Sequence, residues 1–454
     1  MDITKRRLIF ILFLIAFILC TPVIILYVSG YRYNFKKNNW EKTGIIFIQT
    51  EPEKINLFLN DNLKPGSSPY RLKNLLPNEY HLKITKDGYY SWEKNINVNS
   101  GQTTFLQYIK LFKKNPTPEI IINGYFDYTT INPAKTKIAL IENINNKQNL
   151  VIFDLLLNKI KKSPAAISQI QSINFVDNNI IQLTSADNLI FIDSIQAETN
   201  TPLSFKTATN IDNASNLKIF NHNYHTVYYT VNGKLFSSNL LTKIKNDLGL
   251  SPSPIIDYYL DDNFIYIIDN QSLGSSLVKK INLSDLASSQ TISTLPRSDK
   301  YEFKLITKNY IVIKNKLTKD TIILNQETNQ QKTIKNVNFI TWNQNQNQLL
   351  YTTDRELWTI DLTNQNQQQS YTSTLLVRAS NNIESASLYP NDTHILYSIS
   401  GNLSISENIP GQRVIQQLIS LESISNITTN KKGDNIYFIA KIGNQQGLYQ
   451  LQIQ

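Results

Sequence analysis

Two histidines three residues apart, His222 and His225, are the side chains in this sequence whose type and spacing come closest to a metal site. Imidazole nitrogens bind zinc, but a tetrahedral zinc site needs additional Cys, His, Asp or Glu ligands. The one cysteine, Cys20, is about 200 residues away in the chain, and no third ligand is suitably spaced. The pattern therefore indicates a polar turn, and we predict neither a metal ion nor a cofactor.

The acidic residues and the glycines lead to the same expectation for catalysis. Asp257, Asp261 and Asp262 lack the spacing of a calcium-binding loop, and aspartates in turns more often cap backbone N–H groups. The sequence has no Gly-x-Ser-x-Gly motif, and its 14 glycines include no phosphate-binding loop. We predict no catalytic residue and no enzyme, and the ligand-binding residues stay unknown at this stage.

A third candidate is the aromatic pair Tyr90 and Trp92, which could stack on a sugar or close a hydrophobic core. It follows the stretch from Asn74, NLLPNEYHLKITKDGYYSW, in which Tyr80, Leu82 and Ile84 alternate with polar residues. Alternation with a period of two predicts a half-buried antiparallel strand that begins at the Pro77-Asn78 turn. Core closure is the favoured role of the two aromatics.

Residues 43–112 contain a series of such segments, with a strand about every ten residues, which is typical of a small β-sandwich. Several motifs in this stretch resemble the PEGA domain family: Ser68-Pro69, Leu76-Pro77-Asn78-Glu79-Tyr80, Lys86-Asp87-Gly88-Tyr89, Trp92 and Ser100-Gly101. The motif that names the family is reduced to Pro52-Glu53-Lys54-Ile55, and Asn78 occupies a position where glycine is usual. Asparagine tolerates a positive φ, so the turn can be kept. The resemblance implies a compact β-domain of the kind found in cell-surface and envelope proteins.

The chain begins with an uncharged run from Leu8 to Val28, which is long enough to cross a bilayer core of roughly 30 Å. A cleaved signal peptide and a lipoprotein modified at Cys20 are less consistent with its length and flanks than an uncleaved signal anchor. We therefore expect a cytoplasmic tail at 1–7, a single-pass transmembrane helix at 8–28 and a juxtamembrane segment at 29–42. Basic residues flank both ends of the run, so an orientation with the C-terminal domains outside is favoured without excluding the reverse.

Charge is concentrated in the first quarter of the chain. Residues 1–114 hold 17 Lys and Arg against 8 Asp and Glu, a net +9, whereas the remainder holds 28 against 27, a net +1. A basic region beside a membrane favours anionic lipid or an anionic wall polymer, although simple solvation of surface lysines gives the same pattern. No run of Lys and Arg interleaved with aromatics is present, so we predict no nucleic-acid partner.

After a polar, proline-containing linker at 113–118, residues 119–454 repeat a loose unit of apolar strands separated by polar turns. We count eight starts, near Tyr128, Ile173, Leu217, Ile256, Phe303, Phe339, Ala386 and Ile424. The period is roughly 42 residues, which is within the range of β-propeller repeats. The last unit has three strands, and Glu119–Gly124 could supply its fourth and close the ring. Seven units remain an alternative count.

The turns Pro390-Asn391-Asp392 and Lys432-Gly433-Asp434, each followed by an Ile-x-Tyr-type strand, resemble those of TolB-like and WD40-like propellers. The expected fold class is therefore all-β, with a PEGA-like sandwich and an eight-bladed propeller behind one N-terminal helix. The expected function is membrane-anchored binding or scaffolding at the cell envelope, with a protein or glycan ligand on the propeller. The alternatives are a propeller hydrolase or lyase acting on surface glycan, and a scaffold facing the cytoplasm.

Overall fold

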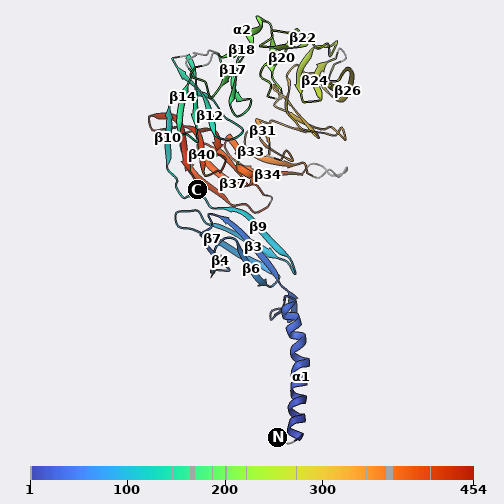
Figure 1. Ribbon diagram of the computed structural model, residues 1–454, viewed down its shortest axis with the longest axis vertical. Helices are drawn as coiled ribbons and strands as arrows, with labels where there is room; N and C mark the ends of the chain where they lie inside the picture. The colour runs from blue at the N-terminus through green and yellow to red at the C-terminus, as the bar shows by residue number, and fades with distance from the viewer. Residues whose placement is uncertain are drawn as a thin grey trace. The chain divides into compact units, whose positions relative to one another are not determined.

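The computed structural model describes residues 3–145, 147–163, 169–186, 188–199, 202–220, 222–271, 274–343, 345–363, 372–409 and 411–454. These residues form two compact units. The first comprises Met1–Pro116 with Gly411–Leu418 and Ile453–Gln454, and the second comprises Thr117–Pro410 with Ile419–Gln452. Figure 1 shows the chain coloured from its N-terminus to its C-terminus.

The first unit begins with helix α1 (Ile3–Val28). Its segment Arg6–Val28 is long and apolar enough to cross a membrane, and none of its most apolar part is buried against the protein. A run of this length that exposes Leu, Ile and Phe on every side is stable only in an apolar environment. Length and composition thus fit a membrane span or a signal sequence.

A short hairpin follows the helix directly. Strands β1 (Tyr31–Asn34) and β2 (Asn39–Lys42) pair with each other in an antiparallel register and with no other strand among the described residues. The Asn34 side chain accepts hydrogen bonds from the backbone N–H groups of Lys36 and Lys37, at 3.0 and 3.3 Å, and this fixes the turn.

The rest of the first unit is a sandwich of two sheets. Its strands are β3 (Gly44–Glu51), β4 (Asn56–Leu59), β5 (Asn62–Lys64), β6 (Tyr70–Leu75), β7 (Asn78–Thr85), β8 (Trp92–Val98) and β9 (Thr103–Lys110). One sheet has the order β6-β3-β9 and the other β5-β4-β7-β8. Strands β3 and β9 run parallel, a pairing that the alternation of residues along each strand does not reveal.

The sandwich core forms where the alternating faces of the two sheets meet. Strand β3 alternates between buried and more exposed positions along its length, and β8 does the same. Leu82 and Ile84 of β7 are fully buried and Tyr80 packs against them, which confirms the face expected from the sequence. Burying each such side chain contributes about 1.5–3 kcal/mol of transfer free energy.

The propeller consists of eight four-stranded antiparallel sheets within the described residues. Four of them are β11 to β14 (Phe126–Ile131, Lys137–Ile144, Lys147–Asp154, Lys159–Lys162), β15 to β18 (Ser172–Phe175, Ile180–Thr184, Leu189–Asp193, Leu203–Ser204), β19 to β22 (Ser215–Lys218, Thr226–Val231, Lys234–Asn239, Lys245–Asp247) and β23 to β26 (Ile255–Leu260, Phe264–Asn270, Ser275–Asn282, Asp285–Pro296). The next three are β27 to β30 (Tyr301–Ile306, Tyr310–Asn315, Thr321–Asn325, Gln331–Ile334), β31 to β34 (Phe339–Trp342, Gln348–Thr352, Glu356–Asp361, Thr372–Arg378) and β35 to β38 (Ile383–Leu388, His394–Ile399, Asn402–Glu407, Ile415–Ser420). The short helices α2 (Phe205–Thr209) and η1 (Pro390–Asp392) lie between strands.

The eighth sheet closes the ring by joining the two ends of this part of the chain. It contains β39 (Ile424–Thr429), β40 (Asn435–Ile442), β41 (Gln445–Gln452) and, as its outer strand, β10 (Pro118–Asn123). In Figure 1 the blue-green β10 lies beside the red strands of this sheet. The expected closing strand at Glu119–Gly124 is thereby confirmed, and it protects an edge that would otherwise be open.

Hydrophobic clusters join neighbouring sheets of the propeller. Ile141 and Leu150 of the sheet β11 to β14 pack with Ile181 and Leu183 of the sheet β15 to β18. Equivalent clusters join the following sheets in turn as far as the sheet β35 to β38, and another joins the eighth sheet to the first. Since each sheet is packed on both faces, its middle strands contain runs of consecutive buried residues, as in β28 and β36.

The first strands of the sheets form the hub of the ring. Strand β11 contacts both β15 and β39, and β35 contacts β39. Many of these strands are interrupted by β-bulges, for example between Ile383 and Ser385 in β35 and between Ser425 and Thr428 in β39. A bulge changes the direction of the side chains that follow it, so the hub strands do not keep a strict period of two.

A candidate binding cavity at the hub of the propeller

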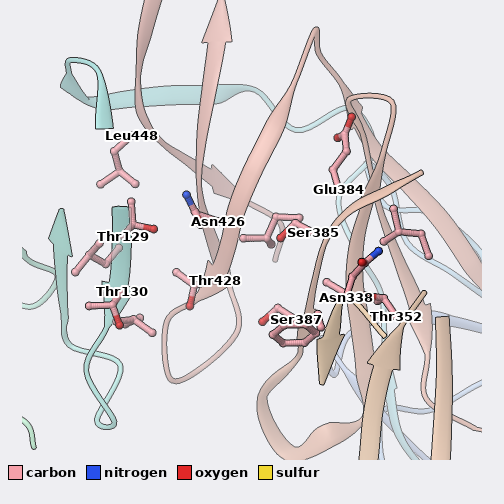
Figure 2. Close-up of a pocket in the computed structure, with 16 residues that line it drawn as sticks. Thr129, Thr130, Asn338, Thr352, Glu384, Ser385, Ser387, Asn426, Thr428 and Leu448 are labelled. Atoms are coloured by element: carbon pink, nitrogen blue, oxygen red, sulfur yellow. The ribbon is translucent and has the colours of Figure 1, made fainter. Parts of the chain in front are cut away.

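The hub contains a cavity of about 490 Å³, which we call the hub cavity. Its walls come mainly from the first strands of four sheets, β11, β31, β35 and β39. Figure 2 shows side chains of these strands, and of Asn338 just before β31, around one space: Thr129, Thr130, Asn338, Ser385, Ser387, Asn426 and Thr428. This volume is within the range of about 300–1,000 Å³ that small-ligand sites occupy.

The lining of the hub cavity is polar but almost uncharged. Thr129, Ser385 and Thr428 are half-buried, and Asn426 is exposed. Within the described residues none of these four side chains makes a hydrogen bond to the protein. Their hydroxyl and amide groups are therefore available to a ligand that enters the cavity. Glu384 is the one charged residue among those that line it.

Backbone geometry explains how Asn426 comes to line the cavity. Its φ is +53°, in the left-handed region that asparagine tolerates better than most residues. It lies within the bulge of β39, where the pairing with β40 shifts between Ser425 and Thr428. Because of this bulge, the consecutive residues Asn426, Ile427 and Thr428 all line the cavity, whereas in a regular strand Ile427 would point to the opposite face.

A second cavity, of about 530 Å³, shares Phe339 and Ser387 with the hub cavity and is lined further by the turns after β11, β35 and β39. It contains an aromatic donor, because the indole Nε1 of Trp342 is buried and has no hydrogen-bond partner among the described residues. Lys135 also lines it and donates a hydrogen bond to Thr429 Oγ1 at 3.2 Å. Burial lowers the pKa of Lys135, and the carboxylate of Asp392 opposes this effect.

Strands β19, β23 and β27 are held together at the hub by a buried carboxylate. Asp257 is 2 % exposed and accepts hydrogen bonds from Asn216 Nδ2 at 2.8 Å, from the Phe303 N–H at 2.7 Å and from Lys218 Nζ. Lys218 also donates to the carbonyl of Tyr258 at 2.7 Å. Burial lowers the pKa of Lys218, while Asp257 stabilises its charged form. These donors come from β19 and β27, so Asp257 of β23 joins three sheets, and its oxygens are occupied by groups of the protein.

The residues singled out for metal binding point to different partners. The ring of His222 contacts the carbonyl oxygen of Val176, whereas the ring of His225 packs against Tyr224 with 4.2 Å between centroids. Asp261 caps a turn by accepting hydrogen bonds from the N–H groups of Asn263 and Phe264, at 2.9 and 2.7 Å. Over the described ranges, no three His, Cys, Asp or Glu residues form a group that could hold a metal ion. The expectation that the chain is not an enzyme stays a prediction from the sequence.

The aromatic pair of the small sandwich divides between two roles. Trp92 is 3 % exposed and belongs to the core of the sandwich, as expected. Tyr90 is half-buried, and its hydroxyl donates a hydrogen bond to the carbonyl of Gln417 at 2.7 Å within the first unit. Because Trp92 is buried, the two rings do not form a shared surface on which a sugar could stack.

Comparison with known proteins identifies the first of the two folds. Residues 43–113 match the model of the PEGA domain. This stretch is a PEGA domain. The matched residues contain the motifs noted in the sequence, and Lys54-Ile55 stands in them where the family motif has Gly-Ala. No curated protein matches the chain.

Solved structures identify the second fold. The C-terminal WD40 domain of Sif2 aligns at 13% identity with a TM-score of 0.51, covering 75% of this chain and 99% of that one. The Dos1 propeller aligns at 13% identity with a TM-score of 0.50, covering 75% of this chain and 94% of that one. At this level of identity the similarity shows the fold alone: a WD40-like β-propeller follows the PEGA domain.

The residues of the hub cavity were not foreseen from the sequence. Small hydroxyl residues recur in the first strands of several repeats, as in Tyr-Thr-Thr from Tyr128 and in Ser385-Ala386-Ser387. That recurrence was a usable signal, since a first strand with Thr and Ser leaves room at the hub. Which sheets bring these residues together depends on ring closure and bulges, which a repeat pattern does not specify.

Proposed function

We propose that this chain is a membrane-anchored binding protein whose propeller binds a segment of a partner protein in the hub cavity. The observation that carries the proposal is the set of hydroxyl and amide side chains, Thr129, Ser385, Asn426 and Thr428, that face the cavity without protein partners. Neutral donors and acceptors match the N–H and C=O groups of a peptide, and they offer little to a strongly charged ligand.

The uncharged lining favours a protein ligand over an anionic polymer. An anionic wall polymer or polyanionic glycan requires Lys or Arg at the site, and the hub cavity contributes only the carboxylate of Glu384. WD40-like propellers commonly bind proteins, which supports the same assignment by analogy of fold. A neutral glycan remains the second class of ligand, because hydroxyl and amide groups can bind sugars as well.

The location that we propose is the cell envelope, with helix α1 as a signal anchor and the PEGA domain and propeller outside the cytoplasm. The uncharged run Leu8–Val28 and the basic residues Lys5, Arg6 and Arg7 that precede it support this arrangement. Protease treatment of intact cells that carry a C-terminal epitope tag tests it. Loss of the tag while a cytoplasmic control protein survives supports the outside location, and protection of the tag indicates the cytoplasm-facing scaffold instead.

Site-specific photo-cross-linking in living cells tests the ligand. A photoreactive residue at Ser385 faces the hub cavity, and the matched control carries it at Thr291, an exposed position on the outer strand β26. We expect a discrete adduct from position 385 that is lost in a Thr428→Trp background, which fills the cavity, and kept in Thr428→Ser, which retains the hydroxyl. An adduct that contains peptide supports the proposal. A carbohydrate adduct, or equal labelling from both positions, contradicts it.

A further inference from the structure

The hairpin β1–β2 has an aromatic cluster that is partly exposed to solvent. Tyr33 lies edge-on to both Phe35 and Trp40, with ring centroids 5.1 and 5.6 Å apart. Phe35 is 88% exposed and Trp40 is 40% exposed. A two-stranded hairpin on its own is only marginally stable in water, so an exposed aromatic face on such an element requires an explanation.

The two faces of the hairpin differ in chemistry. Tyr33 pairs directly with Trp40, and Tyr31 pairs with Lys42, so these four side chains share one face. Asn34 and Glu41 belong to the other face, where Asn34 Nδ2 donates a hydrogen bond to Glu41 Oε2 at 2.8 Å. The polar groups of the opposite side are hydrogen-bonded within the protein, whereas the aromatic side can contact an apolar environment outside it.

The position of the hairpin in the chain indicates what its aromatic side contacts. The hairpin begins three residues after helix α1 ends at Val28, and Arg32 connects the two elements. The Arg32 guanidinium donates to the carbonyl of Tyr27 at 2.8 Å and lies 3.6 Å from the centroid of the Tyr27 ring. If α1 crosses a bilayer, these contacts hold the start of the hairpin at the level where the helix leaves the apolar layer.

The charge of the hairpin matches an anionic headgroup region. Residues 31–42 contain four basic side chains, Arg32, Lys36, Lys37 and Lys42, and one acidic side chain, Glu41, a net +3. Tyr and Trp concentrate at the interface between headgroups and acyl chains, and lysines beside them are attracted by anionic lipid.

We propose that the hairpin β1–β2 docks into the headgroup layer of an anionic membrane, with Phe35 and Trp40 inserted and Lys36 and Lys42 among the lipid phosphates. This inference rests on the membrane anchoring proposed above. It adds a second contact to the single helix, so that the chain meets the bilayer through a folded element as well as through its anchor.

Fluorescence of a single labelled cysteine in the full chain, reconstituted into vesicles, tests the docking. In a Cys20→Ser background, an environment-sensitive label is attached to Phe35→Cys in one variant and to Leu63→Cys in the control. Leu63 is a large apolar residue on β5 that is 59% exposed, so the two positions are matched. Vesicles are made of phosphatidylcholine alone or with phosphatidylglycerol.

We expect the label at position 35 to be shielded from aqueous iodide and quenched by lipids brominated near the headgroup, most strongly with phosphatidylglycerol. The label at position 63 should show the reverse behaviour in both kinds of vesicle. Wild-type tryptophan emission should also be quenched by the brominated lipids, and Trp40→Phe should remove that quenching. This control uses the unlabelled protein, so it is independent of the labelled cysteines. Lys36→Gln with Lys42→Gln should reduce the difference between the two lipid compositions.

Flotation of the vesicles separates the possible failures. If the protein floats with the vesicles but the labels at positions 35 and 63 are equally accessible to iodide, the hairpin inference is wrong and the anchoring proposal survives. If the protein does not float with the vesicles, both are wrong.

Discussion

Replacement of Asp257 by Asn should destabilise the propeller far more than its single-atom change suggests. The amide keeps one acceptor oxygen for Asn216 Nδ2 or the Phe303 N–H, which are 2.8 and 2.7 Å from the carboxylate, but it removes the charge that balances Lys218. Breaking a buried ion pair by removing one partner typically costs about 3–5 kcal/mol. Because the Lys218 side chain is 26% exposed and can be partly hydrated, we expect Asp257→Asn to lower the free energy of unfolding of the propeller by an amount at the lower end of that range, about 3 kcal/mol.

Equilibrium denaturation followed by tryptophan fluorescence measures this change, because Trp342 and Trp358 lie in the propeller. Lys335→Met is the matched control. It breaks the pair of Lys335 with Asp320, whose side chains are 74% and 20% exposed, and exposed pairs contribute about 0–1 kcal/mol. A similar small effect for both variants would refute the claim that Asp257 holds a buried charge.

The double variant Asp257→Asn with Lys218→Met provides a sharper test. If Asp257 acts mainly by balancing Lys218, removing both charges should cost less than removing the carboxylate alone. Additive losses would mean that the two side chains do not act as a pair.

The pH dependence of Asp257→Asn has a definite sign. Burial already lowers the pKa of Lys218, and loss of the carboxylate lowers it further. A lysine whose pKa is lower in the folded state than in the unfolded chain destabilises the fold below its folded-state pKa. That penalty disappears as the pH rises toward the unfolded value of about 10.4. The deficit of the single variant should therefore shrink between neutral and alkaline pH, and the double variant should lack this trend.

Two further predictions concern the turns and the tyrosines of the propeller. In the same denaturation assay, Gly433→Ala should destabilise the fold several times more than Gly443→Ala. Both glycines have a positive φ, at +81° and +58°. A Cβ at position 433 would collide with the buried ring of Tyr389, whereas a Cβ at position 443 meets open space. Burial raises the pKa of Tyr351 and of Tyr437 to about 12, so the stability that their neutral phenols contribute is complete below the unfolded pKa of about 10 and is lost as the pH rises through 12. Absorbance of the phenolate should show that both tyrosines ionise at higher pH than an exposed tyrosine. Phenylalanine at either position should make the free energy of unfolding fall less steeply with pH in that range. An unchanged dependence on pH would contradict this.

The sequence predicted the repeating part of this fold in some detail. Each of the eight starts lies in or immediately beside the first strand of a sheet, including the weakly patterned ones near Ile173 and Leu217. The apolar face of β7 and the role of Trp92 in the core were also correct. These successes have one cause, because alternation and turn residues are local and a strand buried on one or both faces must display them.

What the sequence did not predict depends on which strands become neighbours. The parallel pairing of β3 with β9 brings together residues more than fifty positions apart, and neither strand carries a mark of its partner. Asp257 was grouped with Asp261 as a turn residue, yet it lies in strand β23 and binds donors from β19 and β27. A carboxylate in a strand is costly to bury unless donors surround it, and those donors come from distant repeats.

Bulges in the first strands connect these two unforeseen features. In the described residues, six first strands carry one: β11, β19, β23, β27, β35 and β39. The extra residue interrupts the alternation at the hub, so side chains that strict alternation would direct between the sheets instead line the centre. On β35 and β39 these are Ser385 and Thr428, which leave a cavity; on β23 it is Asp257, which is bound by its neighbours. The same local irregularity therefore joins the sheets on one arc of the ring and, on another, leaves polar side chains that line the hub cavity.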